Sequence, residues 1–249
     1  MDGVEPCLFP TLLDENPGGK ERRVLVTSSV DLGSGLPLRE FCQRHEVTLP
    51  NLFHVAWGIV LRIYTGSDSV CFGSLNSGRD VPVSGINDIV GPFINMLVCR
   101  MQVVSDAPVL SLVQMNQNQY LESLPYQHYS LADVLHLAGG SNQEETSIRL
   151  ETVAGYDPTE YDVSVTVAIA EERMEICLSS WTTGLGKQQA EKVAGTFKQV
   201  VFEMAQRPYD SAKQLNVSDA GTGGAVRARP DRGAVPRAAG RARRVRVGR

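Results

Sequence analysis

Histidine is scarce in this sequence of 249 residues, and that scarcity limits the acid–base chemistry the chain can offer. There are four histidines, and no two of them are adjacent. A Gly-x-Ser-x-Gly elbow, a Walker loop and a dinucleotide-binding glycine fingerprint are also absent. These absences argue against a serine hydrolase, a P-loop nucleotidase and a Rossmann-type dehydrogenase.

Cysteines with metal-ligand spacing are missing too. No Cys-x-x-Cys pair occurs, which argues against a zinc site or a redox motif. The five cysteines lie far apart, at Cys7, Cys42, Cys71, Cys99 and Cys177. Their neighbours are mainly apolar, so we expect small buried side chains rather than nucleophiles. We expect neither a bound metal nor a cofactor.

No apolar run is long enough to cross a membrane. The longest, Leu52 to Tyr64, is interrupted by His54 and Arg62 and is too short for a hydrocarbon core of roughly 30 Å. Residues 1–10 have neither the basic region nor the sustained apolar run of a secretory leader. We therefore expect no membrane partner and a cytoplasmic location.

Charge is present but unevenly distributed. The net charge is -4, yet residues 220–249 contain nine arginines and one acid, which leaves 15 basic and 27 acidic residues in the rest. Residues 221–249 have almost no large apolar side chain and cannot bury enough surface to offset their ordering entropy. We expect a disordered basic tail over residues 209–249. The tail lacks aromatics and the body is acidic, so nucleic acid is an unlikely partner despite the arginines.

The apolar pattern predicts intermixed strands and helices. Strand patterns cover residues 24–30, 70–75, 97–104, 161–170 and 174–180, of which the last two form a hairpin. Helical patterns cover residues 38–45, 52–64, 108–124, 131–137 and 186–205. Thr48 and Gly66 should cap the second helix, and Ser105 or Asp106 should begin the third. The expected class is α/β or α+β, a mixed sheet flanked by helices.

Each histidine has an ordinary structural explanation. His54 and His136 lie inside amphipathic helices, and His45 lies at a helix end, where a cation is favoured. His128 precedes a helix start in a loop and is the best candidate for a functional histidine. No adjacent histidine, Asp-Gly partner or nucleophile motif accompanies it, so we assign no catalytic residue.

Two neighbouring motifs carry a family resemblance. Phe72-Gly73 ends a strand and is followed by Ser77-Gly78-Arg79, then by Gly91-Pro92-Phe93-Ile94-Asn95 and Arg100. This order is similar to the C-terminal lobe of nonribosomal peptide synthetase condensation domains. The family motif Gly-x-Phe-Val-Asn-Thr-x-x-x-Arg is matched at Gly91, Phe93, Asn95 and Arg100, with Ile94 as a conservative replacement of valine and Met96 replacing threonine. The segment beginning Gln127-His128 resembles the family's His-Gln-Asp-Tyr-Pro-Phe-Glu motif in part.

The resemblance covers about residues 4–208 and implies a fold and a reaction. It implies a linker over residues 1–20 and one lobe of chloramphenicol-acetyltransferase-like fold over residues 21–208. In the family, two lobes enclose a tunnel that admits two carrier-protein phosphopantetheine arms, and a downstream amine attacks an upstream thioester to give an amide. Phosphopantetheine is then a substrate arm rather than a cofactor. The implied tunnel or lobe-interface residues are Gly73, Ser77, Gly78, Arg79, Gly91, Phe93, Asn95, Arg100 and His128.

The family's His-His-x-x-x-Asp-Gly motif belongs to the N-terminal lobe and has no counterpart in this sequence. The resemblance thus implies a lobe that is inactive alone and has the missing N-terminal lobe as its partner. Arg79 matches the arginine that pairs with the aspartate of that motif, so we expect it to be unpaired and hydrated. We also expect exposed apolar surface beside it. The alternative is a non-catalytic module that docks a carrier protein or another domain.

The segment after Gly140 departs from the family pattern. Five polar residues, 141–145, lead almost directly to Ile148, where the family has another apolar strand. This difference indicates that a central strand is missing.

Overall fold

A mixed six-stranded sheet organises the protein. The computed structural model describes residues 9–13, 23–79, 84–91, 94–127, 146–151, 161–170, 172–215 and 217. The strands are β1 (Leu25–Gly33), β2 (Ser69–Asn76), β3 (Asn95–Gln102), β4 (Thr146–Glu151), β5 (Val163–Ile169) and β6 (Met174–Trp181). Their order in the sheet is β1-β6-β5-β4-β2-β3. β4 runs parallel to β2 and β5, whereas the other neighbouring pairs are antiparallel.

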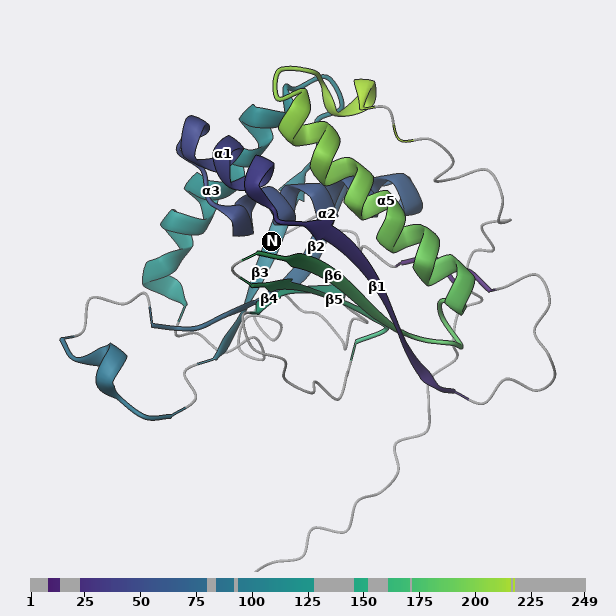
Figure 1. Ribbon diagram of the computed structural model, residues 1–249, viewed down its shortest axis with the longest axis horizontal. Coiled ribbons are helices and arrows are strands. Elements are labelled where there is room, and N and C mark those ends of the chain that lie inside the picture. The colour runs from purple at the N-terminus through teal and green to yellow at the C-terminus, as the bar shows by residue number, and fades with distance from the viewer. Residues whose placement is uncertain are drawn as a thin grey trace, which may run out of the picture.

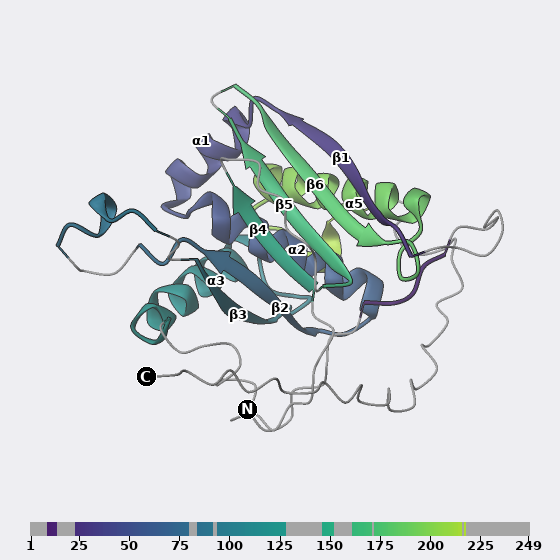
Figure 2. The ribbon, with the colours of Figure 1, turned by 90° about the horizontal axis from the view of Figure 1, so that it is seen from below.

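Helices cover one face of this sheet (Figures 1 and 2). The α-helices of the described residues are α1 (Leu36–His45), α2 (Leu49–Thr65), α3 (Val109–Ser123) and α5 (Lys187–Gln206). The short 3-10 helices are η1 (Ile86–Asp88), η2 (Leu124–Tyr126) and η3 (Ala212–Gln214). α5 packs on β1 and β6, α2 packs on β2, β3 and β4, and α3 packs on α2. The expected class, a mixed sheet flanked by helices, is confirmed. None of the helices described is long and apolar enough to span a membrane.

The core lies between the sheet and helices α2 and α5. Alternate residues of β6 are fully buried because side chains of a strand point to opposite faces of the sheet. On the helical side, Trp57 and Phe53 of α2 meet Phe197 of α5 edge to face, with ring centroids 5.6 and 6.3 Å apart. These long-range contacts hold the two helices together, and α2 carries one wall of the candidate site described below.

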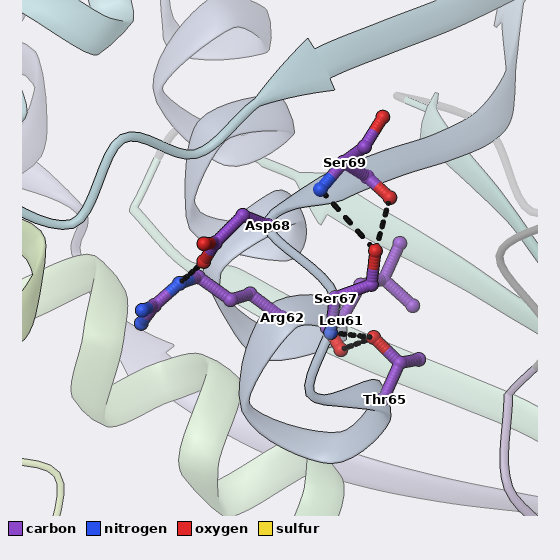
Figure 3. A network of polar contacts seen from close by, with 6 residues as sticks. All are labelled: Leu61, Arg62, Thr65, Ser67, Asp68 and Ser69. Carbon is purple, nitrogen blue, oxygen red and sulfur yellow. Dashed lines mark hydrogen bonds and ion pairs between the residues drawn. The ribbon is translucent and has the colours of Figure 1, made fainter. Parts of the chain in front are cut away.

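Polar contacts fix the turn from α2 into β2 (Figure 3). Gly66 caps α2 with a φ of 72°, as predicted, and its N–H donates to the Arg62 carbonyl at 2.9 Å. The Arg62 Nε donates to the Asp68 carboxylate at 2.5 Å, and the Ser67 hydroxyl donates to the Ser69 carbonyl at 2.8 Å. Together these contacts fix the start of β2. They therefore also fix the position of Asn76, the last residue of β2.

Three expectations about the elements are corrected. α3 begins at Val109 with Pro108 as its N-cap residue, not at Ser105 or Asp106, because the N–H groups of Val109 and Leu110 bond to the carbonyls of Asp210 and Pro208. Residues 208–210 thus supply the carbonyl acceptors for the first two N–H groups of α3. The lobe also continues past Pro208, since Ala212 and Leu215 are buried in the core.

The third correction concerns the strand that was expected to be missing. β4 is present, and it lies between β5 and β2 in the centre of the sheet. Its backbone pairs with Gly73–Leu75 on one side and with Val163–Ala168 on the other. Pairing on both sides explains why a six-residue segment with alternating polar and apolar residues forms a strand without a continuous apolar run. The predicted helix over 131–137 lies outside the described residues.

Candidate functional site

Arg79 anchors a loop at the end of β2. Its Nη1 donates to the Ile86 carbonyl at 2.6 Å, and its Nη2 donates to the carbonyls of Ile89 and Gly91, both at 3.1 Å. The expectation that Arg79 would be unpaired is therefore wrong. Three backbone carbonyls of its own loop supply the acceptors, and a guanidinium, with five donors in a planar fork, can bind several at once.

The loop that Arg79 holds carries exposed apolar side chains. Ile89 is 46% exposed, Val90 is 99% exposed and Ile94, just before β3, is 59% exposed. We call these three residues the apolar tip. Figure 2 shows the segment around η1 projecting beyond the ends of β2 and β3. The expected exposed apolar surface near Arg79 is therefore present.

A cavity of about 220 Å³ lies between α3 and the neighbouring strands β2 and β3. It is lined by His54, Ser74, Asn76, Leu97, Val98, Cys99, Arg100, Asn116, Gln119, Tyr120 and Ser123. Asn76 is the last residue of β2 and directly precedes Ser77-Gly78-Arg79. The cavity therefore adjoins, along the chain, the loop that Arg79 anchors.

His54 forms the inner wall of this cavity and is itself buried. Its Nε2 lies 2.9 Å from the Ser74 hydroxyl, and its ring meets Phe72 edge to face at 5.8 Å between centroids. Burial lowers the pKa of His54 to about 4, because the surroundings disfavour the charged ring. The imidazole is therefore neutral near pH 7, and its pKa lies well below that of an efficient general base.

Hydrogen bonds connect three polar side chains, Cys99, Asn116 and Asn51, of which the first two line the cavity. The Asn116 amide donates to the Asn51 side-chain oxygen at 2.7 Å, and the Cys99 thiol donates to the Asn116 oxygen at 3.3 Å. Burial, and to a lesser degree nearby Cys71, raises the pKa of Cys99 to about 12. Burial likewise raises the pKa of Cys42 to about 11. Both thiols stay protonated near pH 7, which agrees with the expectation that they are not nucleophiles.

The residues expected from the family motif fall into two groups. Ser77, Gly78, Arg79 and Gly91 come together in the anchored loop, where the Arg79 N–H also donates to the Ser77 hydroxyl at 3.4 Å. Gly73 and Arg100 lie on β2 and β3, and Gly73 is buried where an added Cβ would come within 2.8 Å of the Met96 sulfur. Phe93, His128 and the side chain of Asn95 lie outside the described residues.

Arg100 is the one residue of the cavity lining that was predicted as a site residue. The buried polar residues His54, Ser74 and Asn116 were among those not predicted. His54 does lie within an amphipathic helix, as expected, but the pairing of His54 with Ser74 depends on how α2 packs on β2. The sequence gives no signal for that contact, because 20 residues separate the two positions. Among the described residues, no group of three or more His, Cys, Asp or Glu side chains is arranged to hold a metal ion.

Comparisons with known proteins identify the family of this chain. The family described as Condensation domain matches residues 19–222. The nonribosomal peptide synthetase ungA' of Aspergillus campestris is 40% identical over 235 residues, which is 87% of this chain and 2% of that synthetase. D-lysergyl-peptide-synthetase subunit 1 of Epichloe festucae var. lolii is 34% identical over 88% of this chain and 7% of its own length.

The fold is similar to that of solved synthetase structures. Holo-AB3403, a four-domain nonribosomal peptide synthetase, aligns with a TM-score of 0.70 at 16% identity over 85% of this chain and 19% of that chain. The first condensation domain of the calcium-dependent antibiotic synthetase aligns with a TM-score of 0.64 at 14% identity, over 80% of this chain and 48% of that chain. The chain thus spans a small part of its synthetase relatives and about half of a solved condensation domain. This protein belongs to the condensation-domain family of nonribosomal peptide synthetases.

Proposed function

We propose that this chain supplies the C-terminal lobe of a condensation domain and acts together with a histidine-bearing N-terminal lobe. In the proposed reaction, the amine of one carrier-bound aminoacyl group attacks the thioester carbonyl of another. A C–N bond forms and the C–S bond breaks, the amine loses a proton to a base of the other lobe, and the departing sulfur leaves as a thiol. The observation that carries the proposal is the loop in which Arg79 presents the apolar tip.

The apolar tip supports a partner surface on energetic grounds. An exposed valine or isoleucine gains roughly 1.5–3 kcal/mol when a partner buries it fully. Val90 is almost completely exposed, and the guanidinium of Arg79 bonds to the carbonyls on either side of it, those of Ile89 and Gly91. A pre-formed apolar surface loses little entropy on association, so it suits the contact with a second lobe.

The described histidines favour a base from outside this lobe. His54 stays neutral and buried, with a pKa of about 4. His45 ends α1, where its ring packs against Phe41 and Tyr209 at centroid distances of 4.8 and 6.2 Å. The low pKa of His54 and the place of His45 at the end of α1 suit neither for the role of base, so the proposed reaction takes its proton acceptor from the partner lobe.

The proposal extends to the fold family, the substrates and the cellular location of the chain. We propose a chloramphenicol-acetyltransferase-like lobe that acts on carrier-protein-bound thioesters, with phosphopantetheine as the substrate arm. We also propose the cytoplasm as its location. Free thiols at Cys42, Cys99 and Cys177 support a reducing compartment, since oxidising compartments favour disulfides.

Reconstitution tests the proposal. The full chain is mixed with a separately produced N-terminal condensation lobe that carries the His-His-x-x-x-Asp-Gly motif and with two loaded carrier proteins, and the amide product is measured by mass spectrometry. We expect product with the parent chain and at least about a tenfold loss with Val90→Asp, equivalent to about 1.4 kcal/mol of association. Leu121→Asp, at an exposed position of α3, is the matched control and should retain activity.

The same experiment separates catalysis from docking. No amide with any pairing of lobes would overturn the proposed reaction. If the parent chain still captures a loaded carrier protein and Val90→Asp does not, the chain is a non-catalytic docking module. The exposed apolar tip is the observation that favours this second function.

A further inference from the structure

We propose that the cavity between α3 and β3 is a specificity pocket for an uncharged side chain that ends in a carboxamide or hydroxyl group. The inference rests on the proposed function, because it assigns this side chain to an aminoacyl substrate of the condensation site. Four properties of the cavity support it: its place in the chain, its size, its charge and its unused hydrogen-bonding groups.

The place of the cavity connects it to the Arg79 loop. Asn76 lines the cavity and lies three residues before Arg79, which holds the carbonyls of the loop. Its rim is accessible, since Gln119 is exposed and Tyr120 and Ser123 are half-buried. A substrate held beside the loop can therefore extend a side chain into the cavity.

The size of the cavity matches one side chain. Its volume of about 220 Å³ is below the roughly 300–1,000 Å³ of pockets that bind whole small molecules or cofactors. Leu97 and Cys99 provide an apolar wall from β3, and α3 closes the other side. The cavity therefore accommodates a side-chain-sized group and leaves the rest of its molecule outside.

The lining carries almost no charge. Arg100 is the one charged residue in it, and the alternation along β3 directs its side chain to the face opposite Cys99. His54 is neutral near pH 7. A carboxylate or ammonium group in the cavity would lose its hydration and gain no counter-charge, which is unfavourable. An uncharged ligand group avoids that cost.

Asn116 has hydrogen-bonding capacity that the protein does not use in full. This side chain is only 4% exposed. One of its N–H groups bonds to Asn51, and its oxygen accepts from Cys99, which leaves a second N–H and a second lone pair on a residue that lines the cavity. The Ser74 hydroxyl, beside His54, is also able to donate and accept. A ligand carboxamide or hydroxyl matches these groups, whereas an aliphatic side chain leaves them unsatisfied.

Binding of isosteric probes to the full chain tests the pocket. N-acetyl-glutaminamide, N-acetyl-glutamate α-amide and N-acetyl-leucinamide differ at the side-chain end in charge and hydrogen bonding. The readout is the ring carbon–proton NMR signal of His54, one of four histidines and assignable by its loss in His54→Gln. We expect a saturable shift with the glutamine probe and binding at least about tenfold weaker for the glutamate and leucine probes, a difference of about 1.4 kcal/mol.

Variants on α3 localise the binding. Ser123→Trp, which fills the rim of the cavity, should abolish the shift, and Asn118→Trp, on the exposed face of the same helix, should preserve it. The proposal is overturned if no probe gives a saturable shift, if the glutamate probe binds as tightly as the glutamine probe, or if a folded Ser123→Trp variant still binds. The assay needs neither a partner lobe nor amide formation. Its failure therefore leaves the reconstitution result intact, and failed reconstitution leaves a positive binding result intact.

Discussion

The hydrogen-bond donors of Arg79 find acceptors in the backbone of their own loop, although a carboxylate of the partner lobe was expected to pair with them. Its guanidinium bonds to three carbonyls, and each such charged hydrogen bond contributes roughly 1.5–3 kcal/mol, less where solvent competes. The bonds hold a loop that contributes few residues to the core. Arg79 therefore controls local order more than global stability.

Arg79→Lys should loosen this loop selectively. Lysine keeps the charge but cannot reach three carbonyls with a planar fork, so the free energy of local opening should fall by about 1–3 kcal/mol. Hydrogen exchange should then be roughly 10- to 100-fold faster for amides of residues 86–91, with unchanged exchange in α2 and β6. Arg173→Lys, at an exposed ion pair with Asp31, serves as the control. Equal exchange in the parent and in Arg79→Lys would contradict the anchoring role.

His54 should make stability depend on pH. Its pKa is about 4 in the folded chain and 6.5 in the reference state, so between these values the unfolded chain binds more protons. The free energy of unfolding is fully present above pH 6.5 and falls as pH drops toward 4. The loss should reach about 2 kcal/mol by pH 5.

Urea unfolding of the parent chain and His54→Gln at several values between pH 7 and pH 5 measures this effect. Carboxyl groups contribute to both proteins alike, so the difference between the two curves isolates the histidine. The stability advantage of the parent over His54→Gln should shrink by about 2 kcal/mol across this range. A difference that does not change with pH would show that His54 titrates normally.

At the scale of elements, local sequence signals predicted the helices well. α1, α2 and α5 follow their apolar periodicity, and Thr48 and Gly66 flank α2 as expected. The start of α3 was missed because proline offers no side-chain cap, and its first N–H groups bond to a distant segment. β4 was missed for a related reason, since its partners on both sides come from remote parts of the chain.

The candidate site was predictable only where it follows a linear motif. Ser77-Gly78-Arg79 and Gly91 were identified from the motif, but the hydrogen-bond acceptors of Arg79 were not. These acceptors are backbone carbonyls, and every residue type has one, so the sequence does not indicate which carbonyls bind the guanidinium. The cavity forms where four elements, α2, α3, β2 and β3, pack together, so no single segment of the sequence predicts it.

Gly35, at the junction of β1 and α1, illustrates how an element boundary is fixed by packing. Its φ is 65°, and an added Cβ would lie 2.3 Å from the sulfur of Met174, which is fully buried. Gly33 has a similar φ of 72° but open space around it. Gly33→Ala should therefore cost about 1 kcal/mol from backbone strain alone, and Gly35→Ala at least about 2 kcal/mol. Urea unfolding of both variants measures the difference, and equal losses would contradict the packing argument.

At the scale of the whole molecule, an acidic body, a basic tail and an exposed apolar tip all act on association. Residues 1–219 carry 15 basic and 27 acidic residues and residues 220–249 carry nine arginines and one acid, so the tail of one copy attracts the body of another at low salt. Salt screens this attraction, with a Debye length of about 10 Å at 0.1 M, but leaves the apolar attraction in place. Self-association through the tip should therefore persist at moderate salt.

Sedimentation velocity across a range of concentration and salt tests this balance. The parent chain should form concentration-dependent oligomers that persist between about 0.02 and 0.3 M salt, and its unfolding transition should occur at a moderate temperature. Val90→Asp should reduce the association at least about tenfold, because it places a charge at the centre of the tip. Leu121→Asp should associate like the parent if the tip is responsible. A parent chain that stays a monodisperse monomer under all these conditions and unfolds cooperatively at high temperature would contradict the view that its apolar tip awaits a partner lobe.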